Sequence, residues 1–260
     1  MLPLADYAYR IKTYFPYKRA EIKDLLICTL LLSFIISFRE WGVGTFDIGD
    51  GLENWGTSFL LVGISLFIIT AAQRLVGIYH GYQVEYRLWL LGLLTGVTLV
   101  FVSRGALWFL LPGGIMVNHL AGHRLGFHRY GMDYYMLGLI SYAGTVAAFL
   151  LALLVKLLGI ENVLLDKLVM FLVLFIIFDM LPIPPLTGLK LFYGSRLVYS
   201  FLVTLTLVAG LLLLTEIHPI LLLIISFIAA VVIWFVYYLS IERKIWRGPY
   251  GGGWAPKFKK

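Results

Sequence analysis

The sequence has few charged residues and one cysteine, and each shortage excludes a class of protein. Charged residues make up 13% of the 260 positions and hydrophobic residues 61%, with a mean hydropathy of +0.91. A soluble domain with this composition would lack the polar side chains that its surface needs. The single cysteine, Cys28, excludes a disulfide framework and a cluster of thiolate metal ligands.

No cleavable signal peptide is expected either, because residues 1–23 are polar, basic and aromatic. The formal net charge is +7, but no nucleic-acid-binding motif accompanies it, so nucleic acid is not an expected partner. The basic residues instead lie beside apolar runs, as at the cytoplasmic ends of membrane spans. This pattern predicts contact with membrane lipid, a location in the cell (plasma) membrane, and cytoplasmic N- and C-termini.

Apolar runs close to the length that crosses a bilayer recur along the chain. They predict an all-α polytopic membrane protein with about six to eight membrane segments. The runs cover approximately residues 24–38, 57–73, 88–103, 105–117, 134–158, 168–177, 197–214 and 219–240. Residues 74–87 are expected to form a cytoplasmic turn. The run 105–117 is short and contains Pro112-Gly113-Gly114, so a re-entrant hairpin or a broken helix is expected there.

The apolar run 168–177 ends at a cluster of prolines, Pro182, Pro184 and Pro185. Proline lacks an amide donor and clashes with the preceding turn, so a helix cannot continue here. Irregular backbone at membrane depth must be buried in protein or line a cavity. The break therefore predicts an internal site, the alternative being a plain exit from the membrane. Asp179, just before the prolines, is either part of this site or an interfacial residue in contact with water.

The stretch from Phe178 to Phe192 resembles the F-N-L-L-P-I-P-P-L-D-G motif of site-2 protease-type intramembrane metalloproteases, the peptidase M50 family. Residues 139–152 resemble the family's I-S-L-A-G-P segment, and residues 81–93 resemble the segment that follows the zinc helix in archaeal members. Pro112-Gly113-Gly114 is similar to their A-P-G-A turn. The resemblance implies an archaeal-like site-2 protease core over residues 24–192, after an interfacial segment, 1–23. A C-terminal transmembrane pair, 193–240, and a basic cytoplasmic tail, 241–260, follow.

Catalysis in that family uses zinc held by the two histidines of H-E-x-x-H and the aspartate of L-D-G, with the glutamate as general base. The aspartate position here is Thr187, and the family asparagine is Asp179. The histidine helix has two placements. Counting back from residues 81–89 places it at residues 69–74, where neither histidine nor glutamate is present. The other placement, His119 to His123, has two histidines at i,i+4 but Leu120 in place of the glutamate.

The first placement is favoured, because the match at residues 85–89 sets the register. It implies a remnant of the catalytic cavity, with no catalytic residue and no metal expected. The residues that would line this remnant cavity are Ile69, Thr70, Gln73, Asp179, Pro182, Pro184, Pro185 and Thr187. In the alternative, His119 and His123 bind zinc with Asp179 or Asp133 as the third ligand. The histidines are otherwise part of a solvated basic loop.

The resemblance without the catalytic groups predicts a pseudoprotease. Such a protein would bind transmembrane segments or partner membrane proteins without cleaving them, and it would need no cofactor. One alternative is an atypical zinc intramembrane metalloprotease that uses His119 and His123. Another is a structural subunit of a membrane complex. A small transporter ranks last, because polar residues do not continue across the predicted spans.

Overall fold

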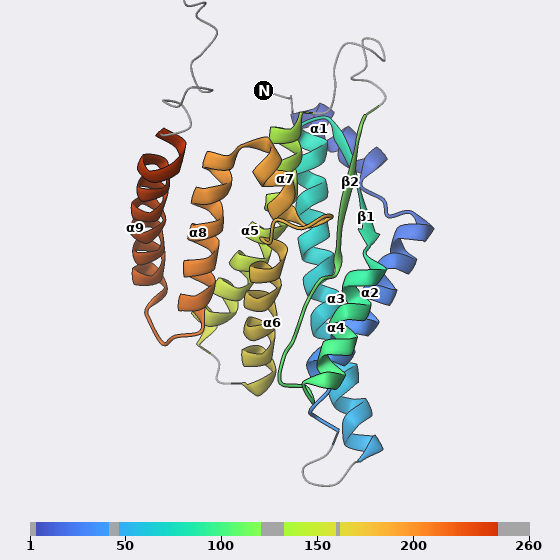
Figure 1. The fold of residues 1–260 in the computed structure, drawn as a ribbon. Helices are drawn as coiled ribbons and strands as arrows, with labels where there is room; N and C mark the ends of the chain where they lie inside the picture. Colours follow the sequence, from blue (N-terminus) through green and yellow to red (C-terminus); the bar gives the residue numbers. More distant parts are fainter. Residues whose placement is uncertain (1–3, 42–46, 121–132, 160–161, 244–260) are drawn as a thin grey trace, which may run out of the picture.

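The computed structural model describes residues 4–41, 47–120, 133–159 and 162–243, which are mostly helical (Figure 1). The helices are α1 (Leu4–Tyr14), α2 (Arg19–Ser37), α3 (Ile48–Tyr79), α4 (Leu90–Val102), α5 (Tyr134–Leu158), α6 (Val163–Asp179), α7 (Thr187–Gly194), α8 (Arg196–Leu213) and α9 (Pro219–Tyr237). A π-helical turn, Tyr238–Glu242, continues α9. Two strands, β1 (Tyr82–Leu88) and β2 (Gly113–His119), flank α4 in the sequence.

Four helices in the described ranges are long and apolar enough to cross a membrane: α3, α5, α8, and α9 with its continuation. They confirm the prediction of an integral membrane protein with a mostly helical fold. Helix α5 begins and ends at the predicted residues, Tyr134 and Leu158. Helix α6 contains the predicted sixth span, residues 168–177, and α2 covers residues 24–37 of the predicted first span, 24–38. The number of crossings beyond the four stays a prediction.

Helix α5 lies in the middle of the bundle, where it contacts α3, α6, α7 and α8 (Figure 1). Its buried face consists mainly of small residues, among them Gly138, Ser141, Gly144, Ala148 and Ala152. Small side chains let helices approach closely. In a membrane, where the hydrophobic effect does not drive helices together, such close packing lets them associate. Helix α9 packs on α8 at one edge of the bundle, and α2 lies toward the other edge (Figure 1).

The structure corrects the expectations for residues 74–87 and 105–117. Residues 74–79 belong to α3, and residues 82–88 and 113–119 form an antiparallel pair of strands, so the fold is not entirely helical. The sequence alone predicts a turn for residues 74–87 and a re-entrant hairpin or a broken helix for residues 105–117. Val84, Ile115 and Val117 lie in one buried cluster with Ile140 of α5. Such β-branched residues suit a strand with one packed face. Gly113, the first residue of β2, has φ +145°, a backbone conformation that favours glycine.

Both outer edges of this two-stranded sheet are held by side chains. Tyr86 and Ile115 are opposite each other in the register. Glu21 Oε1 of α2 accepts a hydrogen bond from the Tyr86 amide at 2.8 Å. Lys190 Nζ of α7 donates to the Ile115 carbonyl at 2.9 Å. Unpaired strand groups are costly in an apolar environment, so these two bonds fix the sheet between α2 and α7.

Glu21 also forms a buried ion pair with Arg74 near the end of α3, and each side chain is less than 5% exposed. The Arg74 guanidinium donates to the carbonyl oxygens of Phe15 and Pro16 at 2.7 and 3.1 Å. It lies 3.9 Å from the ring centroid of Tyr17. These contacts offset part of the cost of removing the charge from water, although Arg74 Nε and Glu21 Oε2 have no hydrogen-bond partner among the described residues. Arg74 therefore joins the segment before α2, helix α2 itself, helix α3 and, through Glu21, strand β1.

We expect Arg74→Met to lower the free energy of unfolding by about 3–5 kcal/mol, because Glu21 would keep a buried charge without its partner. The double variant Arg74→Met/Glu21→Gln should recover part of this loss, since Gln retains an acceptor for the Tyr86 amide. The measurement is reversible unfolding of the purified protein in mixed micelles.

Arg87→Met is the matched control, because the Arg87 side chain is 50% exposed and its contact with Glu85 is 3.7 Å long. We expect this variant to stay within about 0.5 kcal/mol of the parent. Equal losses for Arg74→Met and Arg87→Met would contradict the assigned role of the buried pair.

Candidate functional site

The residues proposed to come from the former zinc helix lie in the last third of α3 and are all buried. Ile69 is part of the apolar core. The Thr70 hydroxyl donates to the Leu66 carbonyl at 2.8 Å and lies 3.0 Å from the Tyr17 hydroxyl. Gln73 Nε2 donates to the Ser141 carbonyl of α5 at 2.9 Å. Thr70 and Gln73 therefore face different neighbours, the N-terminal segment and α5.

Asp179 is the last residue of α6, immediately before the proline break, and it is 6% exposed. Its Oδ2 accepts from the Thr145 hydroxyl of α5 at 2.8 Å. Its Oδ1 accepts from the Thr187 amide at 3.3 Å, at the first turn of α7. Amides in the first turn of a helix lack partners within the helix, and a carboxylate is favoured at that end. Asp179 thus connects α5, α6 and α7 across the break.

Two of the predicted residues, Gln73 and Asp179, contact one face of α5. Ser141, Gly144 and Thr145 are spaced at i, i+3 and i+4, so they share a face. Gln73 lies against Gly144 so closely that a Cβ there would be 2.5 Å from Gln73 Nε2. Asp179 is bonded to Thr145 on the same face. Gln73 of α3 and Asp179 of α6 therefore both contact α5, and Asp179 also bonds the Thr187 amide of α7.

The prolines occupy a different position from the buried polar residues. Pro182 and Pro184 are exposed, and Pro185 is partly buried. The Pro185 carbonyl lies against Gly114 of β2, where an added Cβ would be 2.3 Å away. The connection between α6 and α7 extends toward β2 (Figure 1). Its apolar anchor is Leu186, which is fully buried.

Lys190 adds a positive charge to this region from α7, a helix too short to cross a membrane. Burial lowers the pKa of Lys190 to about 8, and the nearby Asp179 carboxylate opposes that shift. The ammonium group donates to the Ile115 carbonyl. It therefore couples the proline segment to the sheet and places a cation near the buried carboxylate.

The side chains at the family's ligand positions do not fit zinc. Protein zinc sites use cysteine, histidine and carboxylate ligands. Ile69 has no donor atom, and the Gln73 amide is hydrogen-bonded to α5. Thr187 offers only a hydroxyl in place of a carboxylate. Across the described ranges, no group of three or more His, Cys, Asp or Glu is placed to hold a metal ion.

The alternative zinc ligands are only partly described. His119 is the last residue of β2, and its ring lies 4.9 Å from that of Tyr82. Its Nε2 has no hydrogen-bond partner within the described part of the chain. His123 lies outside the described residues. Asp133, one of the two carboxylates considered as third ligand, caps α5 by accepting from the Tyr135 amide at 2.9 Å.

Sequence reasoning missed Thr145, Lys190 and Tyr17 as members of this region. Thr145 carries a hydroxyl group within a mostly apolar helix, and its side chain is fully buried. That pattern indicates an inter-helix hydrogen bond, but it does not say which helix supplies the acceptor. Lys190 lies three residues after Thr187, and only the tertiary structure shows that its side chain is half-buried beside the sheet.

No protein-family model, curated protein or solved structure matches the chain. The resemblance to site-2 proteases therefore rests on the motifs of this sequence.

We expect Asp179→Asn to change the free energy of unfolding by less than about 1 kcal/mol, because an amide can still bond both Thr145 and Thr187. Asp179→Ala should cost about 1–3 kcal/mol for each partner left unsatisfied. Unfolding in mixed micelles measures both variants. If Asp179→Asn were as harmful as Asp179→Ala, the carboxylate would need its charge, and hydrogen bonding alone would not explain its place.

Proposed function

We propose that the chain is a catalytically inactive site-2 protease homologue that binds transmembrane segments or partner membrane proteins without cleaving them. The proposal rests on what the residues at the positions matching the family's zinc ligands contact in this protein. Ile69 packs in the core, Gln73 is bonded to α5, and the Thr187 amide is bonded to Asp179. The residues around them still match the family motifs. In this proposal the chain keeps the family framework, and its polar groups hold the helices together.

A groove between α2 and α3 supports the binding part of the proposal. Its volume is about 320 Å³, and its lining is apolar apart from the hydroxyl groups of Thr29 and Tyr17. Gly63 of α3 lies in the groove, where an added Cβ would be 3.5 Å from the Thr29 side chain. Small residues are typical of surfaces where another membrane helix packs closely. At one end of the groove the Tyr17 hydroxyl reaches Thr70, one of the residues proposed to line the remnant cavity.

The register of the resemblance can be tested by restoring the zinc ligands. We expect Ile69→His/Thr70→Glu/Gln73→His/Thr187→Asp to purify with about one zinc per chain, because three ligands would then meet in a buried site. The parent should hold far less. Elemental analysis of the purified protein measures the zinc, and the melting temperature reports whether the variant folds.

The double variant Gln73→His/Thr187→Asp keeps the core at Ile69 intact and should bind zinc more weakly. Leu120→Glu is the matched control, because it completes an H-E-x-x-H motif at His119 and His123. Zinc in Leu120→Glu and none in either restored variant would place the family helix at residues 119–123. Stoichiometric zinc in the parent, lost when both histidines are removed, would favour the atypical metalloprotease. The pseudoprotease proposal would then be wrong.

Client binding is tested by a photoreactive residue in place of Leu26, which lines the groove and is 53% exposed. We expect cross-links in native membranes to an intact membrane protein. The same residue in place of Val232 on α9, which is 55% exposed, should give mainly lipid adducts. Lipid adducts alone at both positions would contradict client binding in this groove. A captured partner cut within its membrane segment would contradict the loss of protease activity.

A further inference from the structure

The groove between α2 and α3 ends at residues of its own chain. Its lining from α3 includes Phe59, Gly63 and Phe67, and Tyr17, from the segment before α2, closes one end. At about 1.5 Å per residue, the open part of α3 from Phe59 to Phe67 is about 12 Å long. A helix that crosses the hydrocarbon core of a bilayer extends over about 30 Å. The open groove therefore contacts less than half of such a helix.

The face of α3 that lines the groove continues beyond Tyr17. Thr70 and Arg74 follow Phe67 by three and seven residues, so the three side chains share this face. Phe67 is 52% exposed, whereas Thr70 and Arg74 are each 3% exposed. Exposure falls this sharply within one helical turn because another part of the chain covers the face from Thr70 onward.

Residues 15–17, here called the strap, are this cover. The Tyr17 hydroxyl lies 3.0 Å from the Thr70 hydroxyl, and its ring centroid is 3.9 Å from the Arg74 guanidinium. Arg74 also donates to the carbonyl oxygens of the two residues before Tyr17, at 2.7 and 3.1 Å. The strap thus occupies the surface that would otherwise extend the groove.

The strap can leave this surface without breaking the buried ion pair. It is followed by Lys18, the N-cap residue of α2, which is paired with Glu85 of β1. Glu21 comes after this anchored residue, so its pair with Arg74 stays in place when residues 15–17 move. A partly exposed segment held by a few hydrogen bonds opens at a lower free energy than a packed core does.

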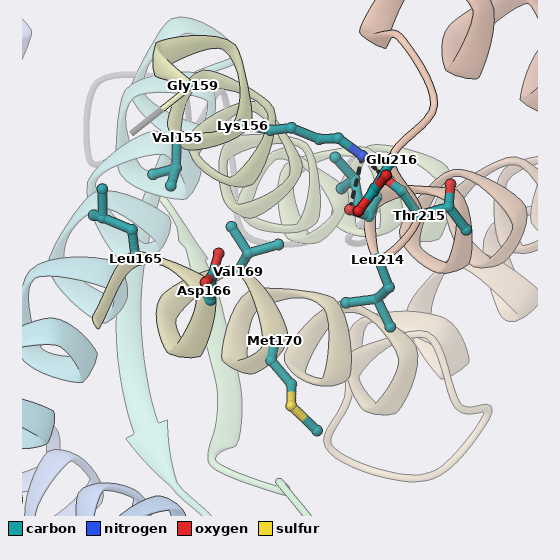
Figure 2. A pocket seen from close by; sticks show the side chains of 11 residues that line it. Val155, Lys156, Gly159, Leu165, Asp166, Val169, Met170, Leu214, Thr215 and Glu216 are labelled. Atoms are coloured by element: carbon teal, nitrogen blue, oxygen red, sulfur yellow. Dashed lines mark hydrogen bonds between the residues drawn. The ribbon is translucent and has the colours of Figure 1, made fainter. Parts of the chain in front are cut away.

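A cavity of about 560 Å³ at the end of the bundle where α5 and α8 end and α6 begins is arranged differently (Figure 2). Lys156 reaches across it from α5 and donates to the Leu213 carbonyl at 3.0 Å, which caps the C-terminal end of α8 (Figure 2). Asp166 and Glu216, which also line it, are exposed. Its charged groups thus cap a helix or face solvent, whereas the strap occupies the continuation of a groove.

We propose that the strap is autoinhibitory, and that a client helix displaces it to contact α3 as far as Arg74. This inference rests on the proposed binding of clients in the groove. Displacement lengthens the open face of α3 beyond Phe67 by about 10 Å. It also takes two carbonyl partners and an aromatic ring away from the buried Arg74 guanidinium, so the closed form is favoured in the absence of a client. The client therefore has to offer Arg74 carbonyl oxygens or an aromatic ring in their place.

Labelling of Thr70→Cys with N-ethylmaleimide in mixed micelles tests whether the strap opens. Cysteine keeps a weak donor and acceptor for the Tyr17 hydroxyl. The buried Cys28 is the internal control, and each rate is divided by the rate of the same thiol in the unfolded chain. We expect position 70 to react at least about tenfold faster than Cys28, because opening of the strap does not require global unfolding.

Addition of Tyr17→Ala should raise the rate at position 70 about tenfold further and leave that of Cys28 within about twofold. Tyr9→Ala is the matched control, because this ring on α1 is 68% exposed, and it should leave both rates unchanged. Equal rates at position 70 and Cys28, no effect of Tyr17→Ala, or equal acceleration of both thiols would each overturn the proposal. Residues 15–17 would then open only together with the whole fold.

The photoreactive residue at Leu26 tests the effect of the strap on clients in native membranes. We expect Tyr17→Ala to raise the yield of protein cross-links at least about threefold and Tyr9→Ala to leave it unchanged. Captured clients with an unchanged yield in Tyr17→Ala would contradict autoinhibition. An absence of protein cross-links in every variant would contradict client binding, while the labelling rates would still decide whether the strap opens. The two proposals therefore fail by different results.

Discussion

The buried pair of Arg74 and Glu21 is the interaction on which much of this structure depends. A charge in an apolar bundle is costly unless it is paired with an opposite charge and hydrogen-bonded nearby. Arg74 meets this demand with Glu21, two backbone carbonyls and the ring of Tyr17. The demand therefore determines where the segment before α2 lies, and it brings α2 against the end of α3.

The same demand explains the two-stranded sheet. A pair of strands leaves outward backbone groups that a membrane environment cannot solvate. Glu21 satisfies the Tyr86 amide on one edge, and Lys190 satisfies the Ile115 carbonyl on the other. Glu21 thus belongs to two sets of contacts at once. Through the sheet, the ion pair on α3 is connected to α7 and to the segment that follows the proline break.

The polar residues at α5 have structural roles. Gln73 and Asp179 meet one face of α5, and each makes hydrogen bonds within the protein. A catalytic metal site needs ligands that are free to bind the metal, whereas a structural set of polar groups satisfies itself. This difference is the physical basis for proposing a protein that binds membrane helices, and the exposed groove between α2 and α3 is where such binding is proposed.

The sequence by itself determined the local features. Continuous apolar length set the bounds of α5, and proline chemistry ended α6 at Asp179, because both act over a few residues. Tertiary structure decided what depends on distant partners. The pairing of β1 with β2 joins segments separated by α4, and Asp179 finds Thr145 34 positions away. The prolines turn outward because Leu186 takes the buried position. No local pattern encodes such choices, since each is made by the packing of whole helices against one another.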